Sequence, residues 1–210
     1  MKEKSYTIEQ IEFVNYVSQK VKDLFLTYTD PAHGVDHIER VVNWAKEIAF
    51  GEHARSIFLC ELSAWLHDIG RTREDKPGEN SRKHHELSYI ILKEWFEEDE
   101  KFNFLSTDEK IELLYAVKYH WNNMADDYDT AWILRDADKL DGYGEVGMKR
   151  ARQLSVGDEE WNWHLRHVYE TSIHIHTKTA KKIIKEKNMM DPVHKASEKY
   201  LKSQIEPIEL

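Results

Sequence analysis

The adjacent pair His67-Asp68 is the most informative chemical feature of this sequence. It follows residues 57–66, a nearly continuous apolar stretch interrupted only by Glu61 and Ser63, which predicts a helix buried on most of its surface. An imidazole and a carboxylate at the end of such a helix are costly to desolvate unless something compensates them. A divalent metal ion binds neutral imidazole and ionised carboxylate together, so it is the natural partner of this pair.

Further His and Asp residues along the chain would complete a metal site. A single His on a helix is weak evidence, because most such residues lie in a core or at the surface. The His-Asp pair and the acidic string RDADKLD at 135–141 make the set specific. Helical bundles build metal sites from inward-facing residues on neighbouring helices. In chain order the candidate ligands are His37, His67, Asp68, His84 or His85, His120 and Asp138.

The apolar spacing predicts the helices that would position these residues. Thr7 and Gln10 form a possible capping box for a first helix, and the segment 30–34 separates it from a second helix that carries the first candidate ligand. The third helix is the apolar one, for which Gly70 is a plausible stop. The polar stretch 71–82 is interpreted as an active-site loop.

The second half of the chain continues the helical pattern. A fourth helix is expected from about His84 to Phe96, and Thr107 is a good N-cap for a fifth that ends near the candidate ligand at 120. A sixth begins near Thr130 and carries the acidic string. Three glycines between 142 and 147 then loosen the chain, and one or two C-terminal helices are expected to close it.

Composition supports an all-α, compact, single-domain bundle. The chain has 210 residues, enough for one sizeable core, and only 8 Gly and 4 Pro. Its formal net charge of -9 counts against binding of a nucleic-acid duplex but leaves small anionic substrates open. Cys60 is the single cysteine, which excludes a disulfide framework, and it is expected in the core. The sequence shows no signal peptide and no membrane span, so we expect a cytoplasmic protein.

These motifs resemble the HD-domain superfamily of metal-dependent phosphohydrolases. His37 lies in HGVDHIERV, similar to the first motif of small bacterial members; LHDIGR contains the pair that names the family; and Asp138 in RDADKLD matches the distal Asp. The resemblance covers most of the chain. It implies one HD-type domain over 1–210, with core motifs at 33–141 and C-terminal helices at 158–205.

The resemblance also implies a ligand set. A first metal would be held by His37, His67, Asp68 and Asp138, and members with a second metal have two extra His residues, here His84 and His120. His85 is the alternative to His84, and a phosphate-contacting or solvent-facing role for both extra His residues stays open. The cofactor is thus one or two divalent ions, with Mn, Fe, Mg, Co and Ni as the candidates.

Other residues are assigned to the substrate. His33 lies four residues before His37, a spacing that in HD-type phosphodiesterases lets the earlier His protonate the leaving group, and its pKa range suits that role. Asp36, Asp136 and Asp141 are expected to orient ligand imidazoles or Lys139 without binding the metal themselves. Arg40 is expected to form a structural ion pair. The basic and imidazole groups expected to bind the phosphate are Lys139, Arg71, Arg82, Lys83 and His85.

The predicted function is hydrolysis of a phosphate ester or anhydride, most plainly of a nucleotide, by a metal-activated water. Trp121, Trp161 and Trp163 lie near polar segments and are candidates for stacking on its base, with an ordinary surface or core role as the alternative. Two rival functions remain. One is a di-iron oxygenase that uses the same ligands, and the other is a non-catalytic nucleotide-binding signalling module. A homo-oligomer is left open.

Overall fold

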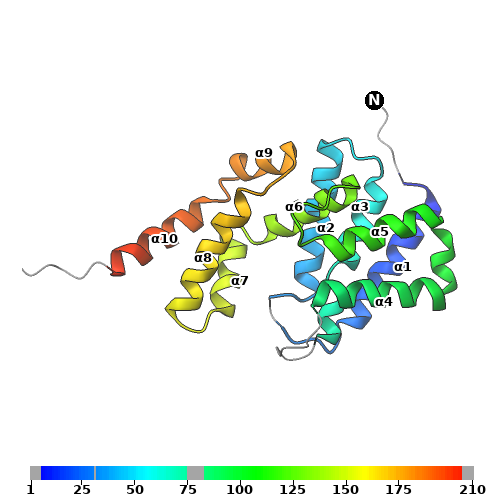
Figure 1. The fold of residues 1–210 in the computed structure, drawn as a ribbon, viewed down its shortest axis with the longest axis horizontal. Coiled ribbons are helices and arrows are strands. Elements are labelled where there is room, and N and C mark those ends of the chain that lie inside the picture. Colours follow the sequence, from blue (N-terminus) through cyan, green and yellow to red (C-terminus); the bar gives the residue numbers. More distant parts are fainter. Residues whose placement is uncertain (1–5, 31, 75–82, 205–210) are drawn as a thin grey trace, which may run out of the picture.

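All regular structure is helical in residues 6–30, 32–74 and 83–204, the part of the chain that the computed structural model describes. This confirms the all-α prediction. The α-helices, shown in Figure 1, are α1 (Ile8–Leu24), α2 (Val35–Gly51), α3 (Ile57–Leu66), α4 (His84–Glu98), α5 (Thr107–Tyr119), α6 (Asp129–Asp141), α7 (Gly144–Leu154), α8 (Asp158–Ser172), α9 (Lys178–Glu186) and α10 (Asp191–Gln204). Two short 3-10 helices, η1 (Ile69–Arg73) and η2 (Glu100–Phe104), join α3 to α4 and α4 to α5.

Helix starts follow local capping chemistry. Thr7 Oγ1 accepts a hydrogen bond from the backbone N–H of Gln10 at 3.2 Å, and the Gln10 side chain accepts one from the Thr7 N–H, which confirms the predicted capping box. The prediction that Thr107 caps α5 is wrong by one residue. Ser106 is the N-cap and forms a capping box with Glu109. Both residues are good caps, and tertiary packing decides between such neighbours.

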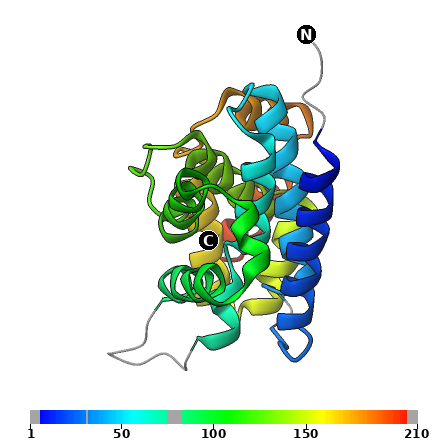
Figure 2. The same cartoon turned by 90° about the vertical axis from the view of Figure 1, so that its right-hand side faces the viewer.

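Helix α3 is the buried centre of the fold. Ser56 begins it by accepting a hydrogen bond from the N–H of Leu59, and every residue from 58 to 66 is buried, Cys60 included. It packs against α1, α2, α5 and α6. Figure 2 views the molecule from the side at which α1, α4 and α5 lie in Figure 1. Burial of each leucine here contributes roughly 1.5–3 kcal/mol. The pair His67-Asp68, which directly follows α3, is therefore held in the interior by a rigid helix.

Gly70 does not stop α3, contrary to expectation. The helix ends at Leu66, and Gly70 lies inside η1, where its N–H donates to Ser88 Oγ at 2.8 Å. A Cβ atom at this position would stand 2.1 Å from the carbonyl oxygen of His84. Glycine is thus required by the close approach of two backbones, and that approach brings the first turn of α4 against the end of α3.

The C-terminal part holds more helix than expected. Four helices, α7 to α10, follow Gly142 in the described chain, where one or two were predicted. The error came from Gly144 and Gly147, which seemed to loosen the chain. Gly144 instead begins α7 with a φ of +69° and donates its N–H to the carbonyl oxygen of Met189 at 2.8 Å. Figure 1 shows α7, α8 and α10 grouped to one side of the bundle formed by α1 to α5.

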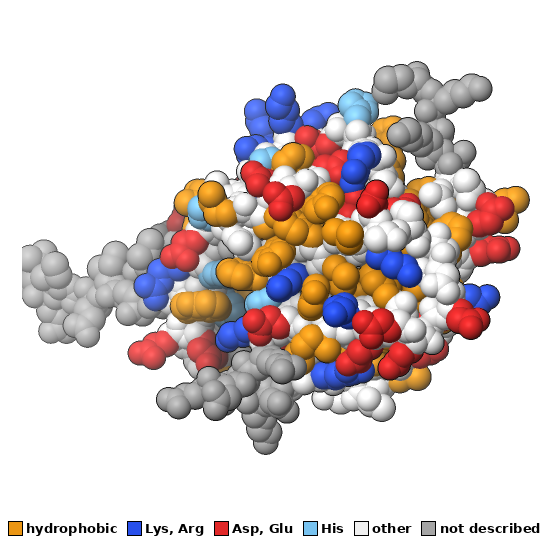
Figure 3. All heavy atoms as spheres, turned by 45° about the vertical axis from the view of Figure 1, so that its right-hand side comes forward, with side chains coloured by type: hydrophobic (Ala, Val, Ile, Leu, Met, Phe, Trp, Pro, Cys, Tyr) orange, Lys and Arg blue, Asp and Glu red, His pale blue; other side chains and the backbone are white. Residues whose placement is uncertain are grey.

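The surface is mixed in character. Figure 3 shows acidic, basic and apolar side chains interspersed over the face it draws. None of the described helices is both long and apolar enough to cross a membrane.

Candidate metal centre

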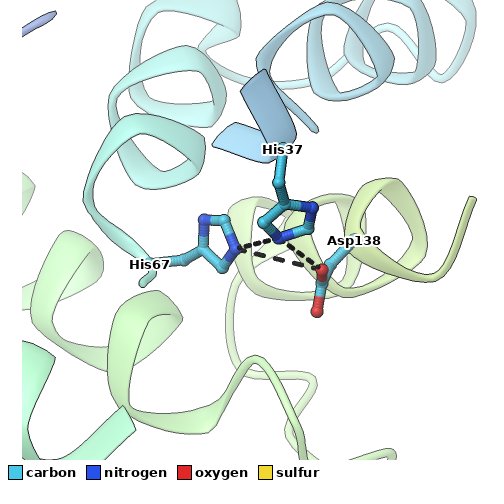
Figure 4. A group of neighbouring side chains, drawn as sticks. All are labelled: His37, His67 and Asp138. Atoms are coloured by element: carbon cyan, nitrogen blue, oxygen red, sulfur yellow. Dashed lines mark hydrogen bonds and ion pairs between the residues drawn. The ribbon is translucent and has the colours of Figure 1, made fainter. Parts of the chain in front are cut away.

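Three helices bring His37, His67 and Asp138 together. His37 lies in the first turn of α2, His67 caps the C-terminus of α3, and Asp138 lies in the last turns of α6. Figure 4 shows the three side chains pointing toward one another. The Nε2 atoms of the two imidazoles are 3.3 Å apart, and Asp138 Oδ1 lies 3.4 Å from His37 Nε2 and 3.9 Å from His67 Nε2. Three donor atoms this close can share one ion.

A second group, formed by Asp68, His84 and His120, lies beside the first. One ligand atom from each of the three residues lies within 4.8 Å of the other two. Asp68 Oδ1 is 3.5 Å from His84 Nε2, while Oδ2 is 3.7 Å from both His37 Nε2 and His67 Nε2. Asp68 therefore presents one oxygen to each group, which places it between them.

Backbone carbonyls set the tautomers of two of the imidazoles. His67 Nδ1 lies 2.8 Å from the carbonyl oxygen of Ala64, and His120 Nδ1 lies 2.8 Å from that of Val117. A carbonyl oxygen can only accept, so each Nδ1 must carry the hydrogen. In the neutral rings the lone pair is then on Nε2, and in both residues Nε2 is the atom left free to ligate a metal.

His37 is oriented by a carboxylate. Its Nδ1 lies 2.7 Å from Asp141 Oδ2, and Asp141 in turn accepts from Arg40 Nε at 2.6 Å and from Arg150. With Nδ1–H donated to Asp141, the Nε2 lone pairs of His37 and His67 face each other. Two lone pairs in that position repel unless a cation or proton lies between them. The donor set thus fits a divalent metal ion.

The pKa values of four ligand candidates, Asp68, Asp138, His84 and His120, agree with this fit. Burial opposes ionisation of Asp68 and Asp138, but the electrostatic interaction with His67 and, for Asp68, with the Arg71 guanidinium outweighs it, so the pKa of each carboxyl lies below its usual value and that of Asp68 well below. Burial lowers the pKa of His84 to about 3 and of His120 to about 4. At neutral pH Asp68 and Asp138 are therefore carboxylates, and His84 and His120 are neutral imidazoles, which are the forms that bind metals.

A cavity of about 420 Å³ opens at the first group and extends to α7 and α8. His33 lines it, half-buried, with Nδ1 at 2.9 Å from Asp30 Oδ2; burial, followed by the charge of Arg71, lowers its pKa. Arg71 also lines it, and its Nε donates to Asp68 Oδ2 at 3.1 Å. Both groups are thus within the same cavity as the candidate ligands.

Lys139 lines this cavity too, but its ammonium group is engaged by the protein. Nζ donates to Asn123 Oδ1 at 2.6 Å and to the carbonyl oxygen of His174 at 3.1 Å. Burial lowers the pKa of Lys139 to about 8. The lysine therefore ties the segment after α5 to the segment after α8, at the edge of the site.

The other phosphate-binding candidates lie apart from this cavity or outside the described residues. His85 is not in either triad: its ring packs on Trp121, with centroids 5.2 Å apart, and its Nδ1 is buried without a hydrogen-bond partner among the described residues. Lys83 is the exposed N-cap residue of α4. Arg82 and most of the predicted loop 71–82 lie outside the described residues, and residues 71–73 belong to η1.

Two residues that were predicted to orient ligands or Lys139 do not orient a candidate ligand. Asp136 accepts hydrogen bonds from the backbone N–H groups of His176 and Thr177, so it anchors the start of α9 and orients no ligand. Asp36 is exposed on α2 and contacts none of the candidate ligands. Asp36 is one position from His37 and Asp136 is two positions from Asp138, and residues at these spacings on a helix do not face each other, which explains why neither orients the nearby ligand.

Two contributing residues were not found from the sequence. Asp30, three residues before His33, orients that ring, and this spacing was a usable local signal. Arg150 holds Asp141 through its guanidinium and also donates to the Asp141 carbonyl oxygen at 3.2 Å. It lies on α7, a helix that was not predicted. By contrast, Arg40 forms the expected structural ion pair.

Comparisons with known proteins agree with this architecture. The family model of the HD domain matches residues 34–143, more than half of the chain. Bacillus subtilis YpgQ, solved in complex with ADP, is 19% identical, with a TM-score of 0.66 over 97% of this chain and 100% of that one. The Lin1889 protein of Listeria innocua is 23% identical, with a TM-score of 0.64 over 94% and 99% of the two chains.

A third similar structure is an HD-superfamily hydrolase from Bacillus thuringiensis. It is 21% identical and has a TM-score of 0.64 over 93% of this chain and 100% of that one. None of the curated proteins matches this chain.

Proposed function

Because the chain belongs to the HD-domain family of metal-dependent phosphohydrolases, we propose that it hydrolyses a phosphate ester or anhydride of a nucleotide. The observation that carries the proposal is the pair of neighbouring triads, with Asp68 offering an oxygen to each, beside a cavity that three of the six ligand candidates line. The ADP complex of YpgQ, a protein of the same fold, supports a nucleotide as the substrate.

The first ion would be held by His37, His67, Asp68 and Asp138, and a second by Asp68, His84 and His120. A divalent ion bound here lowers the pKa of a coordinated water and withdraws charge from a phosphoryl oxygen. Two ions and two carboxylates leave a surplus charge of about +2, which attracts a phosphate despite the acidic net charge of the chain.

His33 is the residue proposed to protonate the leaving group. With Nδ1–H donated to Asp30, Nε2 is the ring nitrogen left for the substrate, and in the imidazolium form its proton would pass to the leaving oxygen. Arg71 would hold Asp68 through Nε and meet the phosphate with Nη2, since Nη1 donates to Glu74 Oε2 at 3.5 Å. Lys139, Lys83, Arg82 and His85 remain proposed phosphate contacts.

The experiment that tests this function combines metal analysis with a substrate screen. The purified protein is loaded with Mn, Fe, Mg, Co or Ni, its metal content is measured, and phosphate and pyrophosphate release is followed over nucleotides and simple phosphate esters. His120→Ala should reduce bound metal from about two ions to about one per chain. His174→Ala, which removes an exposed imidazole that lines neither triad, is the matched control.

Three results would contradict the proposal. Absence of phosphate or pyrophosphate release from every compound with every metal would remove hydrolysis. An iron-dependent reaction that consumes oxygen would favour the oxygenase. An Asp68→Ala protein that keeps its nucleotide affinity and its cellular effect would favour a binding module. Cytoplasmic location and homo-oligomer formation stay predictions.

A further inference from the structure

The cavity that begins at the metal centre has a second end of different chemistry. Helices α7 and α8 form this end, which we call the α7–α8 wall. Its principal side chains are Arg150, Ala151, Leu154, Trp163, His167 and Val168. All of them follow residue 143, where the match to the family model stops. The wall is therefore specific to the C-terminal helices, and the metal centre belongs to the shared core.

Trp163 is the largest exposed aromatic surface of this wall. Its ring lies parallel to that of His167, with centroids 4.9 Å apart and an interplanar angle of 8°. The two residues are four positions apart on α8, so they share one helix face. Trp163 nevertheless remains 53% exposed. One face of the indole is thus covered by an imidazole, and much of the rest is open beside the cavity.

The polarity of the cavity changes along its length. At the metal end it presents Asp68, Asp138 and Arg71, which are charged, and at the wall Leu154, Val168 and Ala151 line it together with the aromatic pair. A ligand that spans the cavity must therefore carry an anionic group at one end and a flat apolar ring at the other. Phosphate and nucleobase have this relation in a nucleotide.

Arg150 stands at the transition between the two ends. One terminal nitrogen of its guanidinium binds Asp141, and its Nε is buried without an acceptor among the described residues.

We propose that the α7–α8 wall is a nucleobase subsite in which Trp163, backed by His167, stacks on the base of the substrate. This rests on the proposed hydrolysis of a nucleotide and identifies the part of the protein that distinguishes a nucleotide from other phosphate esters. Aromatic stacking depends on ring area, so the subsite favours purines over pyrimidines. Trp163 determines specificity and takes no part in the chemistry.

The test compares two ligands that differ only in the base. Binding of AMP and of ribose 5-phosphate is measured by calorimetry on the full-length protein, both with metal removed by chelation and with Mn restored. In wild type AMP binds more tightly than ribose 5-phosphate. Trp163→Ala removes about 5-fold to 150-fold of the AMP affinity, the range of one base stack, and leaves ribose 5-phosphate unchanged. Trp163→Phe retains most of the preference.

Phe50→Ala is the matched control. Phe50 is 59% exposed, as an aromatic side chain at the end of α2, and it does not line the cavity. Its truncation leaves both affinities at the wild-type values. Because Trp163 is equally open to solvent, its own truncation leaves the core intact, and thermal unfolding verifies this for both variants.

Two outcomes overturn the subsite. In one, wild type shows no preference for AMP over ribose 5-phosphate in either metal state. In the other, Trp163→Ala keeps the preference or weakens both ligands alike. The proposed function fails by a different result, the absence of phosphate release from any compound. If the protein hydrolyses simple phosphate esters but shows no preference for the base, the proposed hydrolysis stands and the proposed subsite is wrong.

Discussion

The two ends of the cavity are built in opposite ways. At the metal end the imidazoles of His37, His67 and His120 are buried and held by a carboxylate or a backbone carbonyl. At the α7–α8 wall Trp163 is half exposed, and its ring is supported by its helix neighbour His167. Rigid support suits groups that must meet reacting atoms within a fraction of an ångström. An open aromatic surface tolerates variation in what it binds.

The largest expected effect is the loss of the metal end of the cavity while the α7–α8 wall still binds its ligand. Asp68→Ala and His67→Ala should each abolish metal binding and hydrolysis, because loss of one ligand leaves the other buried and uncompensated. The preference for AMP over ribose 5-phosphate in metal-free protein should survive. Metal content, phosphate release and calorimetry measure the three properties, with His174→Ala as control. Full activity in either variant would remove the pair from the metal centre.

His33→Ala should give the next largest effect. Turnover should fall by about 10²–10⁴-fold with little loss of metal, since His33 is proposed as an acid and its imidazole is held by Asp30. The loss should shrink for substrates with good leaving groups, which need no proton. Rates measured over a series of leaving groups check this. An equal loss for good and poor leaving groups would remove the acid role.

Asp141→Asn tests the orientation of the metal end. The amide keeps the shape of the side chain but removes the charge that binds His37, Arg40 and Arg150, and losses of this kind lower metal affinity about 10–100-fold. Metal titration gives the affinity. Asp36→Asn, an exposed carboxylate on α2, provides the control. Unchanged metal affinity in Asp141→Asn would show that packing alone orients His37.

Lys139→Ala should have the smallest effect. It should show whether the Lys139 ammonium binds the phosphate or only supports the fold. If the ammonium binds a ground-state phosphate, KM rises while kcat changes little. Lys149→Ala, which removes an exposed lysine on α7, controls for net charge. An unchanged KM with a lower melting temperature would instead assign Lys139 to its observed hydrogen bonds with Asn123 and the His174 carbonyl.

The sequence predicted the helical core and the residues that gather in it. Apolar periodicity located α1 to α6 within a few residues, because each helix buries one face or, in α3, nearly its whole surface. It also placed His37, His67 and Asp138 at helix ends that face one core. It failed for α7, whose glycines indicated a loose chain and proved to be compatible with a helix start and close packing.

Local signals could not predict contacts between distant elements. Nothing around Asp136 distinguishes it from Asp141, yet one anchors α9 and the other orients His37. Gly70 looked like a helix stop and is required by the approach of α4. Such roles depend on which distant segment packs against a residue. Loop geometry and helix packing determine which segment that is.

The sequence by itself thus determined the helical class, the buried centre and the types of group available for metal chemistry. These follow from burial and from residue chemistry, both of which act locally. Only the tertiary structure decided that Asp68 lies between two triads, that His84 rather than His85 joins one of them, and that Trp163 meets the same cavity. Those relations join residues more than a hundred positions apart, such as His37 and Trp163, whose separation in space is set by the packing of whole helices.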